Sequence, residues 1–350
     1  MIDGWKKVQV QDICTKGSSN IAQNKIEDNN GDYPLYGASG FLKCIDFYHQ
    51  EKPYIGIVKD GSGVGRVGFY PAKSSLLGTL QYILPKPGFD IRFVGYALKS
   101  LDLASYATGA AIPHIYFKDY GKDFVCVPPS IEDQKKVVDE LDLLNSVIDK
   151  KNAQLRDLDA LSQSIFYEMF GDPIINEKGW TSKALGEACF LKAGKGIKAS
   201  ELSEELTTGL YPCFGGNGIR GYIAKKSHKG TYPIIGRQGA LCGNVQLASG
   251  EFYATEHAVV CTPGKGLQAI YTYYALLAMN LNQYATGVAQ PGLAVKSLLP
   301  LPIVIPPMEL QEVFAERVRR INMQKALLNG SLNQINTLYQ SRMAYYFDCE

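Results

Sequence analysis

The strongest constraint on the fold is an internal repeat, because the chain contains two copies of one sequence pattern. Residues 5–14 (WKKVQVQDIC) align with residues 180–189 (WTSKALGEAC), 175 positions further on. Further matches at nearly the same separation are 33–45 with 211–223, 57–67 with 235–245, 106–109 with 284–287, and 124–134 with 302–311. An almost constant separation predicts two copies of one folding unit. Two copies in one polypeptide favour a pseudo-two-fold arrangement, as in a symmetric dimer.

Composition limits the class of protein. Of the 350 residues, 46% are apolar and 20% are charged, which excludes a mainly disordered chain. The net charge is only +2, so binding to nucleic acid would need a locally positive surface. No apolar run has the length of a membrane span, and the eight cysteines show no CxxC spacing. We therefore expect a cytoplasmic protein with reduced thiols, no membrane contact and no bound metal.

The first part of each copy, residues 1–128 and 177–305, predicts a mixed α/β domain. Short β-branched runs bounded by glycine predict strands. These runs are residues 54–58 and 80–84 in the first copy, and residues 232–236 and 258–262 in the second. Residues 90–105 and 267–283 have the pattern of helices.

The second part of each copy, residues 129–172 and 306–350, predicts one long helix. A Pro-Pro pair opens each segment, Ser130 with Asp133 predicts an N-cap, and Gly171-Asp172-Pro173 predicts the end of the first helix. Apolar residues recur in steps of three and four, the repeat of a coiled-coil seam. The first seam comprises Val137, Leu141, Leu144, Ile148, Leu155, Leu158 and Ile165, and the second comprises Phe314, Val318, Ile321, Leu328, Leu332, Ile335 and Tyr339. The polar residues that interrupt the seams are Lys151, Ser162, Lys325 and Arg342.

The length of these helices suggests how they are used. A helix of about 40 residues is about 60 Å long, too long to lie on one small domain. The expected fold is therefore α/β, with two tandem mixed α/β domains, each followed by a long helix. The two helices are expected to form an antiparallel coiled coil with pseudo-two-fold symmetry and to hold the globular domains at opposite ends. In the alternative, the helices are separate and each docks on a partner protein.

Two motifs suggest catalysis, but the residues beside them do not fit the chemistry. Gly63, Gly65 and Gly68 fit GxGxxG, but the residues after them do not open the helix that would bind a pyrophosphate, so a tight hairpin is favoured. The Pro-Pro pairs lack the polar residue before them and the aromatic residue after them that amino-group DNA methyltransferases use on a flipped base. We expect no catalytic residue in this chain.

Polar residues at predicted loop tips are the candidate binding residues. Arg, Lys, Gln and Asn have the donor geometry that reads guanine and adenine edges. The candidates for DNA binding are Ser39, Lys59, Asp60, Ser62, Arg66 and His114 in the first copy, and Asn217, Arg237, Gln238, Asn244 and Gln290 in the second. For any one of them, an ordinary solvated loop is an equally good explanation. The two copies agree at framework Gly, Pro, Tyr and Trp positions but differ at these tips, which suits two readers of different short sequences.

Together these features resemble the specificity subunit of type I restriction–modification systems. The similarity is carried by the two halves, each followed by a long helix, and by residues 109–141, 287–311 and 169–173 (MFGDP). The resemblance implies that each globular half is a target-recognition domain for one part of a split site on double-stranded DNA, with the helices setting the gap. It also implies two methyltransferase subunits that bind S-adenosylmethionine and restriction (nuclease–translocase) subunits that use ATP. Catalysis and cofactors would then belong to these partners and not to this chain.

Two other functions are compatible with the residues. The chain could be a stand-alone sequence-specific DNA-binding protein, such as a regulator. It could also be an enzyme with an unrecognised site, including a duplicated enzyme domain with one inactive copy. A stand-alone DNA-binding protein would form no complex with a methyltransferase, whereas a specificity subunit would. Methyl transfer by the chain alone would indicate an enzyme.

Overall fold

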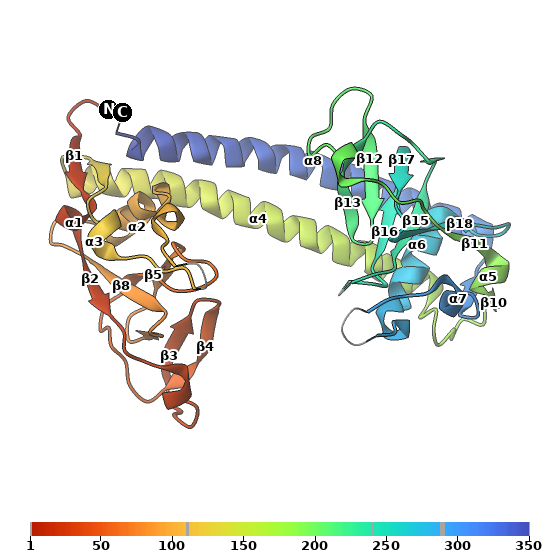
Figure 1. Ribbon diagram of the computed structural model, residues 1–350, viewed down its shortest axis with the longest axis horizontal. Helices are drawn as coiled ribbons and strands as arrows, with labels where there is room; N and C mark the ends of the chain where they lie inside the picture. The colour runs from red at the N-terminus through yellow and green to blue at the C-terminus, as the bar shows by residue number, and fades with distance from the viewer. Residues whose placement is uncertain (1, 110–111, 240, 288–290, 350) are drawn as a thin grey trace. The chain divides into compact units, whose positions relative to one another are not determined.

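The computed structural model describes residues 2–109, 112–239, 241–287 and 291–349. The chain forms two compact units: unit 1 is Met1–Asn152 with Gly330–Glu350, and unit 2 is Ala153–Asn329. Each unit combines one globular half with a part of each long helix (Figure 1).

In its described residues, the globular half of unit 1 forms three small sheets. An antiparallel sheet has the strand order β2-β8-β5-β6, a second sheet has the order β4-β3-β7 with β7 parallel to β3, and β1 pairs with β9. The strands are β1 Lys6–Gln9, β2 Cys14–Ser18, β3 Tyr33–Gly37, β4 Gly40–Ile45, β5 Tyr54–Val58, β6 Val67–Tyr70, β7 Ser75–Leu76, β8 Leu80–Pro85 and β9 Phe124–Val127. The α-helices of this half are α1 Val10–Ile13, α2 Ile91–Ser100 and α3 Phe117–Tyr120, with 3-10 turns at Gln23–Lys25 and Leu103–Tyr106.

The globular half of unit 2 repeats this arrangement in its described residues. Its sheets have the orders β11-β18-β15-β16 and β13-β12-β17-β14, and β10 pairs with β19. The strands are β10 Thr181–Ala184, β11 Cys189–Ala193, β12 Tyr211–Gly215, β13 Gly218–Ile223, β14 His228–Lys229, β15 Tyr232–Gly236, β16 Val245–Ala248, β17 Glu251–Ala254, β18 Ala258–Pro263 and β19 Pro302–Ile305. The α-helices are α5 Leu185–Ala188, α6 Ala269–Ala278 and α7 Val295–Leu298, with 3-10 turns at Ala199–Glu201 and Leu281–Tyr284. Apart from the short added strand β14, the two halves have the same strand order, so the duplicated sequence encodes one fold twice.

The larger buried cluster of each half contains residues of one helix and of the sheet that includes β5 in unit 1 or β15 in unit 2. In unit 1, Ile55 and Ile57 of β5 pack with Phe93 of α2 in one buried apolar cluster. In unit 2, Ile235 of β15 and Tyr271 of α6 occupy a second cluster. The strands predicted at 54–58, 80–84, 232–236 and 258–262 are confirmed as β5, β8, β15 and β18.

The two helices predicted at 90–105 and 267–283 are shorter than expected. Helix α2 ends at Ser100 because Leu101 adopts an extended conformation, with φ −84° and ψ 141°. Helix α6 ends at Ala278, before Asn280, whose left-handed backbone has φ 46°. A 3-10 turn follows each break, and the apolar pattern continues through it, which is why the sequence indicated one longer helix.

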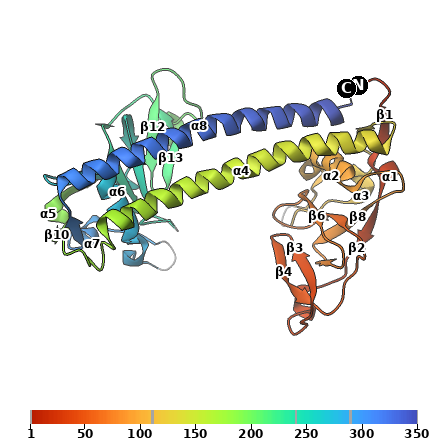
Figure 2. The ribbon, with the colours of Figure 1, turned by 180° about the vertical axis from the view of Figure 1, so that it is seen from behind.

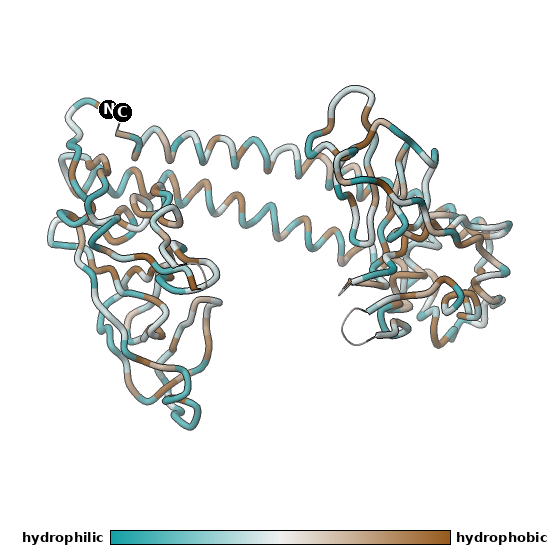
Figure 3. Tube along the Cα trace, in the orientation of Figure 1, coloured by the Kyte–Doolittle hydropathy of each residue, from teal (hydrophilic) through white to brown (hydrophobic). Residues whose placement is uncertain are grey.

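Two long helices, α4 Ile131–Phe170 and α8 Met308–Phe347, connect the units. The predicted N-cap is present, since the backbone N–H of Asp133 donates to Ser130 Oγ at 3.1 Å. Helix α4 ends where Gly171 adopts a φ of +76°, a conformation that glycine tolerates without strain. The helices run beside each other in Figure 2, and Figure 3 shows apolar residues recurring along both.

Contacts inside each unit show that α4 and α8 run antiparallel. In unit 1, Glu140 near the start of α4 accepts from Arg342 near the end of α8, with Nε–Oε1 at 2.5 Å and Nη2–Oε2 at 2.9 Å. In unit 2, the end of α4 lies against the start of α8. There the ring centroids of Phe166 and Phe170 are 5.7 and 5.4 Å from that of Phe314. The alternative of two separate helices is therefore wrong.

The exposure of apolar side chains follows the predicted seam. The seam residues, all of them within the described part of the chain, are buried or half-buried. Apolar residues on the opposite side face solvent, as shown by Leu143 at 65% exposure and Leu327 at 76%, whereas Phe166 and Phe170 are buried outside the seam. A seam of this kind stabilises the pair because it removes apolar surface from water on one face of each helix.

Two of the polar residues that interrupt the seam form ion pairs between the helices. Lys325 of α8 pairs with Asp159 of α4, and Arg342 pairs with Glu140. A third, Ser162, is buried and donates to the carbonyl oxygen of Leu158 at 3.1 Å. Three of the four interrupting residues therefore form specific polar contacts.

Within the described ranges, no helix is long and apolar enough to cross a membrane. The same residues contain no group of His, Cys, Asp and Glu side chains placed to hold a metal ion.

Candidate nucleic-acid interface

The candidate residues of unit 1 gather at the end of the four-stranded sheet where β5 leads into the β5–β6 hairpin. The backbones of Asp60 and His114 form a bridge, and Ile115 N donates to Lys59 O at 3.0 Å. The hairpin therefore lies directly beside the loop that precedes α3. The first tip is defined as residues 59–66 with residues 112–116.

Three predicted residues meet through their side chains at the first tip. His114 Nδ1 donates to the carboxylate of Asp60, and Lys59 Nζ lies 3.9 Å from Asp60 Oδ2. The imidazole also packs against Tyr116, with ring centroids 4.2 Å apart. Since Nδ1 is occupied by Asp60, Nε2 is the ring nitrogen left for a ligand.

The other predicted residues of unit 1 are exposed on turns. Ser62 and Arg66 belong to the hairpin, and Ser39 lies in the turn between β3 and β4. Burial raises the pKa of the Tyr70 hydroxyl, and the nearby Arg66 guanidinium opposes this shift. Among the described residues, no hydrogen bond connects Ser39 to the hairpin, so the structure leaves its predicted role open.

The second tip, residues 237–239 and 241–244 with 291–293 and 216–217, occupies the corresponding end of the sheet in unit 2. Gln238 and Gly292 form a backbone bridge, and Leu293 N donates to Arg237 O at 2.8 Å. The turn between β12 and β13 joins this tip, because Asn244 Nδ2 donates to Asn217 Oδ1 at 2.8 Å. The predicted residue Gln290 lies outside the described residues.

The two tips share a backbone frame and differ in side chains. Bridges join Asp60 to His114 and Thr108 to His114 in unit 1. The same bridges join Gln238 to Gly292 and Thr286 to Gly292 in unit 2. A carboxylate–imidazole pair in one tip is thus replaced by an amide and a bare backbone in the other. The shared backbone bridges can therefore present different hydrogen-bonding groups at equivalent positions of the two tips.

A polar cluster that the sequence does not predict lies behind the second tip. Arg237 N donates to His257 O at 3.1 Å, and His257 Nε2 lies 3.1 Å from Glu256 Oε1. Arg237 Nε and Glu256 Oε2 are buried without a hydrogen-bond partner among the described residues. Buried polar atoms normally have partners, so these two atoms are candidates to bind a ligand group at the tip. The adjacent residues Glu256 and His257 are the one sequence feature that points to this cluster. Their position beside Arg237 is set by the strand pairing of the sheet.

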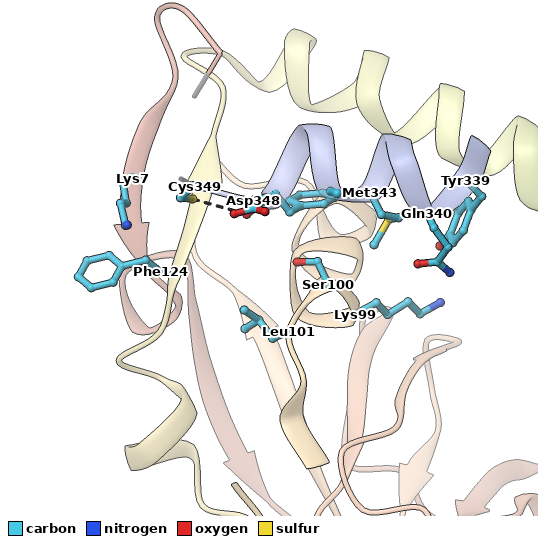
Figure 4. Close-up of a pocket in the computed structure, with 12 residues that line it drawn as sticks. Lys7, Lys99, Ser100, Leu101, Phe124, Tyr339, Gln340, Met343, Asp348 and Cys349 are labelled. Carbon is cyan, nitrogen blue, oxygen red and sulfur yellow. Dashed lines mark hydrogen bonds between the residues drawn. The ribbon is translucent and has the colours of Figure 1, made fainter. Parts of the chain in front are cut away.

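A second candidate surface is a hollow that occurs in both units, away from the tips. In unit 1 it has a volume of about 470 Å³ and lies between the last turns of α8 and the end of α2 (Figure 4). Its lining includes Lys7, Lys99, Tyr339, Gln340, Met343 and Phe347. In unit 2 a hollow of about 240 Å³ is lined by the equivalent part of α4 and by α6: Gln163, Phe166, Tyr167, Tyr274, Leu277 and Ala278. Because the hollow occurs once in each unit, it is a candidate binding surface for two copies of one partner.

Comparison with known proteins places the chain in a family. The model of the type I restriction modification DNA specificity domain matches residues 2–158 and, a second time, residues 177–337. These matches cover most of the chain, which therefore belongs to this family of specificity-domain proteins.

Curated relatives carry the same family description. The type I restriction enzyme EcoprrI specificity subunit of Escherichia coli is 46% identical over 160 residues, which are 45% of this chain and 39% of that protein. A putative type I restriction enzyme specificity subunit of Haemophilus influenzae is 29% identical over 107 residues, 30% of this chain and 28% of that protein. The matched segments thus span less than half the length of these relatives.

Solved structures support the fold. The crystal structure of a type I restriction–modification S subunit from M. genitalium has a TM-score of 0.65 at 16% identity, covering 98% of this chain and 96% of that one. A chain from a structure of type I system assembly and conformational transition has a TM-score of 0.52 at 15% identity, with 98% and 97% covered. At these identities the likeness concerns the fold alone.

Proposed function

We propose that this chain is a non-catalytic DNA-recognition subunit of a type I restriction–modification complex and that it reads a two-part target on double-stranded DNA. The observation that carries the proposal is the pair of tips with one backbone frame and different polar side chains. Two readers of different half-sites need this arrangement. Two copies of a catalytic site would instead be expected to keep the reacting groups alike.

The chemistry of the tips supports direct reading of bases. Arginine and lysine donate to guanine O6 and N7, asparagine and glutamine bind adenine N6 and N7, and each good bidentate contact discriminates by about 1–3 kcal/mol. Arg66 and Lys59 offer the first kind of contact in unit 1. Asn217, Asn244 and Gln238 offer the second kind in unit 2.

The paired helices act in this proposal as the spacer between the two readers. Joining two readers makes the second binding event intramolecular, so the linked pair binds the two half-sites more tightly than either reader binds alone. The spacer must be stiff to fix the gap, and the seam with its interhelical ion pairs supplies that stiffness.

The partners follow from the same proposal. Two methyltransferase subunits would bind S-adenosylmethionine, and restriction subunits would use ATP, so this chain needs no cofactor of its own. The hollow repeated in both units is consistent with a partner present in two copies. Such a complex acts where chromosomal and foreign DNA meet, in the cytoplasm.

Selection from a pool of random duplexes tests the proposal. The full chain should enrich two short sequences separated by a gap of constant length. The chain alone should transfer no label from S-adenosylmethionine, and transfer should begin when a methyltransferase subunit is added. Enrichment of one continuous sequence, or methyl transfer by the chain alone, would contradict the proposal.

A further inference from the structure

A group of basic side chains lies beside the second tip, at the same end of the sheet. Strand β11 is antiparallel to β18, and its last residue, Ala193, pairs with Val259 near the start of β18. Strand β15 ends at this sheet edge too, since Gly236 pairs with Ala258. Lys195 then follows β11 and donates its backbone N–H to Ala254 O at 3.1 Å. The topology therefore brings the end of β11 to the edge that carries the tip.

These side chains line a defined cavity. The cavity has a volume of about 380 Å³, and its lining includes Lys192, Lys195, Lys226, Ser227 and His228. None of the described residues that line it is acidic. Ser227 Oγ accepts the backbone N–H of Ala254 at 3.0 Å, which fixes the loop that carries Lys226 and His228.

The positive charge of the cavity is only partly neutralised by the protein. Lys226 pairs with Glu251 at 3.0 Å. Within the described part of the chain, no carboxylate forms an ion pair with Lys192 or Lys195. Burial, with the charge of Lys192 added, lowers the pKa of His228, so the positive charge of the cavity belongs to its lysines. Lysines without a carboxylate partner attract an anion, and a phosphate group carries the complementary charge.

Unit 1 lacks this group of charges. The strand pairing makes Gly17 of β2 the counterpart of Lys192, because Gly17 pairs with Tyr82 as Lys192 pairs with Val260. At the corresponding sequence positions, Lys195 and Lys226 are replaced by Asn20 and Tyr48. The shared fold therefore does not require the lysines, and they are a feature of unit 2 alone.

We propose that the cavity lined by Lys192, Lys195, Lys226 and His228 binds a backbone phosphate of the DNA that the second tip reads. This inference rests on the proposed function. Contacts to phosphates fix the register of a protein on the duplex, and contacts to base edges supply the sequence preference. The cavity would hold unit 2 in register, while the first tip would act without an equivalent clamp.

The test measures how DNA affinity depends on salt. Each phosphate contact that is lost lowers the slope of log K against log salt by about 1. We compare the full chain with the double variant Lys192→Gln/Lys195→Gln, on the selected duplex and on a duplex of unrelated sequence. The matched control is Lys265→Gln, because Lys265 follows the far end of β18, away from the tip. A parallel titration adds inorganic phosphate at constant ionic strength.

The double variant should reduce the slope by about 1 and weaken both duplexes by the same factor, with unchanged base preference, while Lys265→Gln has no effect. An unchanged slope in a chain that still selects a two-part target would overturn the inference and leave the proposed function standing. Phosphate binding that depends on the lysines, combined with an unchanged DNA slope, would identify a small-anion pocket and also overturn it. A wild-type chain that selects no sequence would count against the proposed function itself.

Discussion

Asn244 donates its side-chain amide to Oδ1 of Asn217 at 2.8 Å, and this bond joins two hairpins from the two four-stranded sheets of unit 2. Among the described residues, the amide N–H groups of Asn217 and the Oδ1 of Asn244 form no other hydrogen bond, so a donor and an acceptor remain. Adenine offers the complementary pair in the major groove, N7 as acceptor and the N6 amine as donor. Under the proposed function, the two residues form one candidate recognition surface, although they lie in different hairpins.

Asn217→Ala should therefore alter base preference at one position of the target. We expect a loss of about 1–3 kcal/mol of discrimination at a single adenine, with the other half-site unaffected. Competition binding with duplexes changed at one base pair at a time measures this. Asn336→Ala, an exposed substitution on α8, is the control. Uniform weakening at every position would show that Asn217 does not read a base.

The contact of Glu140 with Arg342 predicts a pH-dependent contribution to stability. The Arg342 guanidinium, with help from the Tyr346 hydroxyl, holds the pKa of the Glu140 carboxyl below its usual value. The pKa of a glutamate in the unfolded chain is about 4.3, and a lower pKa in the folded chain stabilises the fold at pH values above that. This contribution is lost as the pH falls through the pKa of the folded state.

Glu140→Gln should therefore lower the free energy of unfolding at pH 7 by about 0.5–1 kcal/mol, since the pair is partly exposed. The difference from wild type should shrink as the pH falls below about 4.3. Urea denaturation across this pH range measures it. Asp139→Asn, at the exposed neighbouring position, should show no such difference. A difference that stays constant with pH would contradict the account.

The seam predicts which apolar residues of α8 carry stability. Phe314 is fully buried against Phe166 and Phe170, so Phe314→Ala should cost about 3–5 kcal/mol. Leu327, on the same helix at 76% exposure, should tolerate alanine within about 0.5 kcal/mol. Thermal and urea denaturation of both variants compare them. Equal losses at the two positions would be inconsistent with a one-sided seam.

The spacer role predicts the effect of lengthening the helices. Seven residues inserted after Asn152 and seven after Asn329 keep the seam in phase and add about 10 Å, close to three base pairs. The selected gap should grow by this amount with both half-sites unchanged. Four residues inserted after Asn152 alone turn the seam out of phase and should alter the tolerated gap or abolish binding. An unchanged gap in the seven-residue variant would argue against the spacer.

Much of the fold follows from local sequence patterns. The repeat predicts two copies of one fold, the β-branched runs predict β5, β8, β15 and β18, and the seam predicts the buried faces of α4 and α8. The strands and the seam depend on residues a few positions apart, so a run or a period reveals them, and the repeat is found by comparing the two halves of the sequence. The breaks at Leu101 and Asn280 do not, because single backbone conformations end the helices inside a continuous apolar pattern.

The binding surface was harder to predict because the fold assembles it from distant segments. The sequence predicts Asp60 and His114 as candidates, but their contact depends on the bridge between two loops. It does not predict Lys192 and Lys195, since a lysine at a strand end is usually a solvated residue. Their significance depends on the register of β11 against β18, which no local pattern reveals.

The most direct test of the central claim gives the chain two identical readers. The segment before the first Pro-Pro pair is replaced by residues 177–305, and the full chimera is used to select from random duplexes. If each globular half reads its own half-site, the selected sequence becomes an inverted repeat of the half-site assigned to unit 2, with the original gap. Continued selection of the wild-type asymmetric target by the folded chimera would contradict the account.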